Sequence, residues 1–151
     1  MIALSAALVV GCGAARVPTR GTTVNSTLTD EMTMTGYGGN SGMMGNAGRG
    51  LISIDRASVP SGQVTFVVKN GGLLVHEFVV LQTDVAQDKI GATSGEPGKV
   101  DETRSVGETG AMNAGESTTL TLTLAAGHYV LMCNEVGHYA GGMHVGFTVN
   151  P

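Results

Sequence analysis

Residues 119–143 read TLTLTLAAGHYVLMCNEVGHYAGGM, two strand-like segments that lead into a loop rich in metal-binding side chains. In the first segment leucine alternates with threonine up to Leu124, which is the period of two expected of a half-buried strand. In the second segment, residues 128–133 are mostly apolar and follow Gly127. Two strands in direct succession predict an all-β fold around this stretch.

The strand pattern continues on both sides of this stretch. Apolar residues alternate from Val64 to Val68, and an Asn-Gly-Gly turn follows them. Alternation fails over residues 83–115, which are rich in glycine and charge, and a short helix over 85–90 stays open there. We therefore predict an antiparallel β-sandwich of about 100 residues with one long surface insertion. The further predicted strands are 51–54, 76–81 and 145–149.

The N-terminus has the features of an export signal. Residues 2–10 are almost wholly apolar, too few to span a bilayer, which needs about 20 apolar residues, but enough for a signal-peptide core. Val9-Val10-Gly11-Cys12 resembles a bacterial lipoprotein box, in which cleavage precedes the cysteine and its thiol is acylated. A plain secretory signal is the alternative, since no lysine or arginine stands between Met1 and the apolar run. We predict a signal peptide over 1–11, a lipid on Cys12, and an extracytoplasmic protein in the periplasm or on the outer face of the cell membrane.

Residues 12–48 do not show the pattern of a folded domain. They hold Gly, Thr, Asn, Ser and Met without a sustained period of about 2 or 3.6, and residues 36–42 have linker composition. We predict a flexible tether here, followed by a domain over 49–151. A Cu(I) site of thioether ligands is the alternative, because soft ligands suit that ion. Its four methionines are Met32, Met34, Met43 and Met44.

Composition excludes several classes of function. The chain has 151 residues, with eight lysines and arginines against twelve acidic residues, and a net charge of −4. Without a basic stripe, nucleic-acid binding has no electrostatic support. Two cysteines far apart exclude a disulfide scaffold and a four-cysteine zinc site. If Cys12 carries a lipid, Cys133 has no protein partner.

The loop after the second strand carries the chemistry. Cys133, His138 and Met143 recur at intervals of five residues. Thiolate and thioether are soft donors and imidazole is borderline, so together they favour copper over hard cations. A trigonal copper site needs one more histidine, and His76 begins a predicted strand that pairing could bring to the same end of the sandwich. The other polar candidates are predicted to be surface or structural residues, or to alternate away from the site: His128, His144 and Glu77.

Residues 50–151 resemble a cupredoxin, a small electron carrier with a blue copper site. The resemblance rests on NGGLLVHEF at 70–78, on GHYVLMC at 127–133 and on the loop that follows. The C-x4-H-x4-M spacing is similar to the rusticyanin and sulfocyanin branch of the family. The resemblance implies a Greek-key β-sandwich around one copper ion. The ligands that it implies are His76, Cys133 and His138 in the equatorial plane and Met143 in the long axial position.

The same resemblance implies a carrier of single electrons that cycles between Cu(II) and Cu(I), and not an enzyme. Multicopper oxidases and copper nitrite reductases have histidine beside the copper cysteine, whereas the neighbours of Cys133 are Met132 and Asn134. Gly137 stands where the second cysteine of a binuclear centre would be expected. The expected partners of this monomer are extracytoplasmic redox proteins, such as cytochromes or a terminal oxidase.

In the family, electrons leave through the histidine of the cysteine loop, at an apolar patch. The candidates for this docking patch are Leu74, Val136, Tyr139 and Ala140. Two other functions stay open. One is a copper carrier or copper-resistance protein that hands on the ion itself, and the other is an interaction module of this fold without copper.

Overall fold

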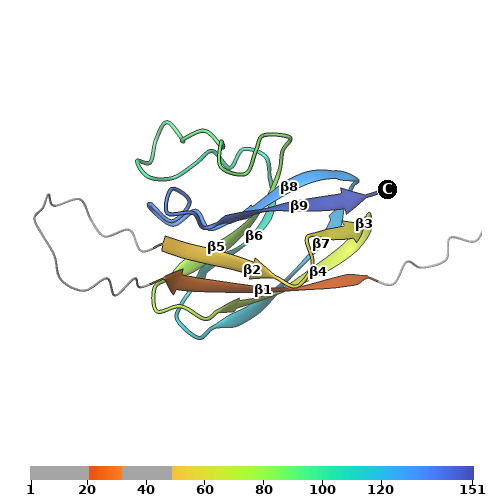
Figure 1. Cartoon of the computed structure of the whole chain (residues 1–151), viewed down its shortest axis with the longest axis horizontal. Coiled ribbons are helices and arrows are strands. Elements are labelled where there is room, and N and C mark those ends of the chain that lie inside the picture. Colours follow the sequence, from red (N-terminus) through yellow and green to blue (C-terminus); the bar gives the residue numbers. More distant parts are fainter. Residues whose placement is uncertain (1–20, 32–48) are drawn as a thin grey trace, which may run out of the picture.

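The computed structural model describes residues 21–31 and 49–151, and within these ranges the chain forms strands and no helices (Figure 1). No helix among these residues is long and apolar enough to cross a membrane. The described part therefore has the all-β architecture that the alternating patterns predict. The strands are β1 (Thr22–Glu31), β2 (Arg49–Ile54), β3 (Ser58–Pro60), β4 (Gly62–Asn70), β5 (His76–Gln82), β6 (Ser105–Met112), β7 (Ser117–Leu124), β8 (Gly127–Met132) and β9 (His144–Asn150).

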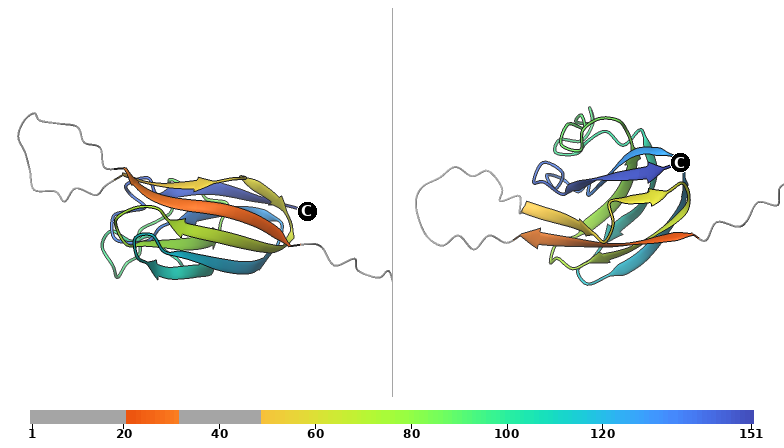
Figure 2. Two further views of the ribbon diagram at one scale, coloured as in Figure 1. Left: turned by 90° about the horizontal axis from the view of Figure 1, so that it is seen from below. Right: turned by 45° about the vertical axis from the view of Figure 1, so that its right-hand side comes forward.

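The strands form two sheets that pack face to face, with the core between them (Figure 2). The four-stranded sheet has the order β2-β1-β4-β7, and the five-stranded sheet has the order β3-β9-β8-β5-β6. β1 pairs with β4 in parallel, as β3 does with β9, while the other neighbouring strands are antiparallel. The predicted β-sandwich is confirmed, and its sheets are mixed rather than wholly antiparallel.

Alternation along β4 decides which of its residues enter the core. Val64, Phe66 and Val68 are fully buried, and the residues between them are more exposed. Phe66 contacts Phe78 and Phe147 of the opposite sheet, with ring centroids 5.4 and 5.6 Å apart. Burying a side chain of this kind contributes roughly 1.5–3 kcal/mol, so the aromatic cluster is a main link between the sheets.

Strand β1 corrects the prediction of a flexible tether over 12–48, which is wrong for residues 22–31. β1 lies inside the four-stranded sheet, between β2 and β4. Val24 and Leu28 are fully buried, while threonine and asparagine alternate with them on the outer face. Only two apolar residues mark the inward face, with Ser26 between them, so the sequence shows the period of two weakly. The sandwich therefore includes a strand upstream of residue 49.

Several sequence predictions lie outside the described residues. They are the signal peptide over 1–11, the lipid on Cys12 and the methionines between residues 32 and 44. These remain predictions.

The surface insertion is shorter than the predicted 83–115, because β6 forms an edge of the five-stranded sheet. The register between β5 and β6 shifts twice, which breaks the alternation that marks a strand in a sequence. Residues 83–104 form the long loop, and its segment 85–90 contains a turn and no helix. The side chain of Asn134 holds this loop by bonding both backbone groups of Val100.

Candidate metal centre

His76 and Cys133 meet because β5 and β8 are antiparallel neighbours in the five-stranded sheet. Val79 of β5 pairs with Met132 of β8, so the first residue of β5 and the residue after β8 lie at the same end. The loop from Cys133 to Met143 then turns back into β9, and the Cys133 N–H donates to the Met143 carbonyl at 3.0 Å. The predicted pairing is confirmed, and it places a strand start beside the cysteine loop.

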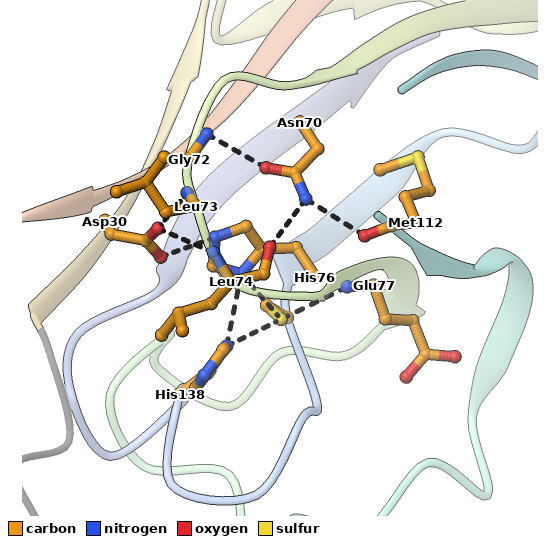
Figure 3. A network of polar contacts seen from close by, with 10 residues as sticks. Asp30, Asn70, Gly72, Leu73, Leu74, His76, Glu77, Met112 and His138 are labelled. Atoms are coloured by element: carbon orange, nitrogen blue, oxygen red, sulfur yellow. Dashed lines mark hydrogen bonds and ion pairs between the residues drawn. The ribbon is translucent and has the colours of Figure 1, made fainter. Parts of the chain in front are cut away.

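Three candidate ligands converge on one point. Nδ1 of His76 lies 3.2 Å from Nδ1 of His138, and the two rings are inclined at 60° to each other, with these nitrogens joined by a dashed line in Figure 3. Sγ of Cys133 lies 3.8 Å from the His76 Nδ1 and 3.4 Å from the His138 Nδ1. These atoms all lie within 4.8 Å of one another, close enough to hold a single ion, and no other such group is found in the described part of the chain. His76 and Cys133 are fully buried, whereas His138 is partly exposed.

The donor set is that of a copper site. Two imidazoles and one thiol form a trigonal set, and thiolate with imidazole favours copper over hard cations. Burial raises the pKa of the Cys133 thiol to about 11 and lowers the pKa of His76. Near neutral pH the metal-free protein therefore holds a protonated thiol and a neutral His76 ring. A metal that binds here must displace the thiol proton, which requires a strong bond to sulfur. These residues fit one copper ion.

A backbone group that sequence analysis missed supports the sulfur. The N–H of Glu77 donates to Sγ of Cys133 at 3.3 Å. Such a donor draws charge from the sulfur and tunes a metal bound to it. The Glu77 side chain lies outside the ligand cluster, as its alternation predicts. Burial, with Glu102 and Glu108 nearby, raises the pKa of this carboxyl to about 7.

A second missed group is Asp30, near the end of β1. Its Oδ1 lies 2.8 Å from Nε2 of His76, the ring nitrogen that faces away from the ligand cluster (Figure 3). Its Oδ2 accepts hydrogen bonds from the backbone N–H groups of Leu73 and Leu74. Burial raises the pKa of Asp30, but the two N–H donors and the adjacent His76 outweigh burial and hold the pKa below its ordinary value. Asp30 thus joins the four-stranded sheet to the loop that leads into β5.

Asn70 fixes the same loop from the other side. Its side chain is fully buried, and Nδ2 donates to the carbonyls of Leu74 and Met112 at 2.8 and 2.9 Å. Its Oδ1 accepts from the Gly72 N–H at 2.9 Å. Each polar atom of this buried amide has a partner, as burial of a polar group requires. His76 therefore follows a loop that is held at several points.

The Met143 side chain is fully buried at the end of the cysteine loop, in the same core cluster as Cys133. It packs against Gly50 of β2, where a Cβ atom would come within 2.6 Å of the methionine Sδ. The Met143 N–H donates to the His138 carbonyl at 3.1 Å. Glycine at position 50 therefore gives the thioether its room, and the loop holds the methionine backbone.

Both loops that carry the candidate ligands contain exposed apolar residues. Leu73 and Val136 are 71% and 62% exposed, and Leu74 and Ala140 are also exposed. The predicted docking residues Leu74, Val136 and Ala140 are therefore exposed, and their role in docking stays a prediction.

The prediction that Tyr139 belongs to the docking patch is wrong, because its side chain is only 8% exposed. The Tyr139 hydroxyl accepts from the Ile90 N–H and donates to the Gln87 carbonyl, both at 2.8 Å. This residue therefore anchors the long loop. The ring of His144 packs against it, with centroids 4.9 Å apart, and His128 is exposed, so both histidines lie outside the ligand cluster.

Comparison with solved structures relates this site to known proteins. Dithionite-reduced auracyanin from the photosynthetic bacterium Roseiflexus castenholzii is 31% identical, over 66% of this chain and 88% of its own, with a TM-score of 0.52. Auracyanin B is 26% identical, over 66% of this chain and 81% of its own, with a TM-score of 0.50. Rusticyanin from Thiobacillus ferrooxidans shows the same fold at 19% identity, over 87% of this chain and 79% of its own, with a TM-score of 0.55. No family model and no curated protein matches the chain.

Proposed function

The chain belongs to the cupredoxin family, and from this premise we propose that it carries single electrons on one copper ion between extracytoplasmic redox proteins. The observation that carries the proposal is the convergence of His76, Cys133 and His138 at adjoining strand ends. The auracyanin relative is described in a chemically reduced form and rusticyanin as a copper protein. Both descriptions support a redox-active copper in this fold.

In this proposal Nδ1 of His76, Sγ of Cys133 and Nδ1 of His138 would hold the ion, and the thioether of Met143, in the same core cluster as Cys133, would be a weaker fourth ligand. Bound copper supplies the Cu(II)/Cu(I) couple. The protein holds the donor atoms from strand ends and bonded loops, so they move little when the charge of the site changes. Burial of His76 and Cys133 excludes water from the sulfur side. The apolar surroundings favour Cu(I) and raise the reduction potential, whereas the weak thioether donor helps Cu(II) and limits that rise.

Electrons enter and leave, in this proposal, through the partly exposed edge of His138. The proposed apolar docking patch consists of the exposed residues Leu73, Leu74, Val136 and Ala140 from the two loops that carry the ligands. A patch of this kind suits the small, transient interfaces of electron transfer. Cytochromes or a terminal oxidase are the proposed partners of the monomer. The extracytoplasmic location and a membrane anchor at Cys12 rest on the sequence of residues 1–12.

We propose a carrier rather than an enzyme because of the residues beside the copper cysteine. Met132 and Asn134 flank Cys133, and both are buried. Neither offers the imidazole that would connect the site to a second metal. A copper carrier that hands on the ion is the competing function, and it requires the ion to leave two fully buried donors, His76 and Cys133.

The absorption and electron spin resonance spectra of the copper-loaded chain test the proposal. A Cu(II)–thiolate bond should give an intense visible band that disappears on reduction and returns on oxidation. A protein that binds only Cu(I), or that loses its copper to a chelator within the mixing time, would be a copper carrier instead.

A transfer experiment tests the docking patch. Val136→Lys should slow electron exchange with a soluble cytochrome at every salt concentration, because it places a charge in the apolar interface. Val85→Lys is the matched control, since Val85 is exposed just beyond the other end of β5. Equal rates in both variants would remove the patch from the proposal.

A further inference from the structure

We propose that Asp30 is a positioning residue of the copper site, which fixes the ring of His76 and lowers the reduction potential of the bound ion. This inference rests on the proposed electron-carrier function. It concerns a residue of the four-stranded sheet, which supplies none of the proposed ligands.

The contact between Asp30 and His76 is buried. Their side chains are 6% and 1% exposed, and Oδ1 of Asp30 lies 2.8 Å from Nε2 of His76. The distance is that of a close polar contact between a carboxylate and a neutral imidazole ring, although the N–H is not aligned well enough for a standard hydrogen bond. Among the described residues Nε2 has no hydrogen-bond partner. Asp30 is thus the group that can hold a proton on this nitrogen.

The groups that face Asp30 are all hydrogen-bond donors, which suits a carboxylate because both of its oxygens accept. Nδ1 of His76 faces the sulfur, so Nε2 carries the ring proton when Nδ1 binds a metal. Oδ2 of Asp30 accepts from the N–H groups of Leu73 and Leu74. All three groups that face Asp30 are therefore donors. An asparagine of the same shape has one oxygen and one NH₂ group. If its oxygen accepted on one of the two sides, the His76 ring or the backbone N–H groups, its NH₂ group would face donors on the other side.

The backbone is shaped to admit this contact. β1 and β4 pair with Leu28 opposite Asn70, which brings Asp30 level with Gly72. A Cβ atom on Gly72 would lie 2.5 Å from Oδ2 of Asp30 and 2.9 Å from Nε2 of His76. Only glycine lets the loop close over the pair at this distance. The loop therefore shields the carboxylate from solvent.

A shielded negative charge one imidazole ring away from copper has a defined effect. It stabilises the more positive Cu(II) over Cu(I), and weak screening in the interior makes the effect larger than at a surface. Asp30 thereby opposes the apolar surroundings, which favour Cu(I). Neutralising it should raise the reduction potential.

The test compares Asp30→Asn with Asp55→Asn in the full copper-loaded chain. Asp55 is a carboxylate just after β2, and it accepts from the backbone and side chain of Asn25 at 3.0 and 2.7 Å. Asn25 lies five residues before Asp30 on β1, a separation of about 17 Å along an extended strand. Both variants therefore remove one bonded carboxylate, near the site in one case and far from it in the other.

Redox titration of the visible band should separate the two variants. Asp30→Asn should shift the Cu(II)/Cu(I) equilibrium toward Cu(I) by about tenfold or more, which is about 59 mV for a one-electron couple. Asp55→Asn should shift it by less than about twofold, because an exposed charge beyond about 10 Å is screened at 0.1 M salt. Equal potentials in both variants would overturn the role of Asp30 while leaving the copper function intact. A wild-type chain without the visible band would instead overturn the proposed function.

Nitrogen NMR of the metal-free chain gives a readout that needs neither copper nor a folded variant. His76 should be the Nε2–H tautomer in the wild type, with a slowly exchanging ring proton. Asp30→Asn, where it folds, should speed this exchange. A wild-type His76 in the Nδ1–H tautomer, or with a rapidly exchanging Nε2–H, would overturn the proposal.

Discussion

The two sheets serve the metal centre in different ways. The five-stranded sheet carries the proposed ligands, since His76 begins β5 and the loop with the other three joins β8 to β9. The four-stranded sheet carries none of them. It contributes Asp30 behind His76 and Gly50 beside Met143.

This difference shows that ligand identity and ligand placement come from different parts of the chain. One loop and one strand start decide which donor atoms are present. The orientation of the donor side chains also depends on β1 and β2, which contact these side chains because the two sheets pack face to face. We expect loss of a histidine or cysteine ligand in the five-stranded sheet to decide whether copper binds, and changes at the weaker ligand Met143 or in the four-stranded sheet to alter the properties of bound copper.

The largest effect is expected at Cys133 in the five-stranded sheet. Cys133→Ser should abolish the visible band, because the thiolate is the source of the charge transfer and the strongest proposed ligand. The measurement is the absorption spectrum after copper loading. His128→Ala is the control, since this imidazole is exposed and outside the cluster. A serine variant that stays blue would refute the ligand assignment.

A smaller effect is expected at Met143, the proposed axial ligand. Met143→Leu should keep the copper and its colour but raise the reduction potential, because a weak donor that helps Cu(II) is lost. Met132→Leu is the matched control, since Met132 is equally buried but belongs to the other core cluster. An unchanged potential in Met143→Leu, or loss of all copper, would argue against an axial role.

Gly50 tests the contribution of the four-stranded sheet to the same ligand. In Gly50→Ala the new Cβ would lie 2.6 Å from Sδ of Met143, so the thioether must move. We expect copper binding to persist, with a potential that rises by less than in Met143→Leu. Gly95→Ala, which meets no atom within 4 Å, is the control. Loss of the visible band in Gly50→Ala would break the proposed division between the sheets.

The smallest effect concerns the stability of the metal-free protein and the side chain of Glu77. The folded protein holds the Glu77 proton up to about pH 7, whereas the ordinary pKa is 4.5. The free energy of unfolding therefore falls as pH rises between these values. Glu77→Gln should be more stable than the wild type at pH 8, by about 1 kcal/mol after allowing for partial exposure, and equal to it near pH 4.

Denaturant unfolding at the two pH values measures this difference. Glu116→Gln is a control of opposite sign, because hydrogen bonds from Asn113 hold the pKa of Glu116 below its ordinary value. That variant should lose stability at pH 8. A pH-independent difference between Glu77→Gln and the wild type would show that the carboxyl titrates normally.

The parts of the fold and site that the sequence predicted are those with local signals. β4 and β7 show clear alternation, and the cysteine loop places three of its donor residues within eleven positions. His76 could be found because it begins a strand rich in valine and phenylalanine. The metal type followed from the softness of the donors alone.

The parts that the sequence did not predict depend on tertiary structure. Asp30 stands in a polar stretch with two inward apolar residues, and it meets His76 only through the parallel pairing of β1 with β4. β6 was hidden by its two register shifts. Tyr139 is next to a candidate ligand, yet its hydroxyl bonds to a loop about 50 residues away in sequence.

The direction of β1 has a consequence for orientation. The strand runs from Thr22, which pairs beside Val64, toward Asp30 at the copper end, and its ten residues span about 30 Å. β1 therefore begins at the end of the sandwich opposite to the candidate metal centre (Figure 1). A contact made at Thr22 would therefore leave most of the length of the sandwich, about 30 Å, between itself and the loops that carry the ligands.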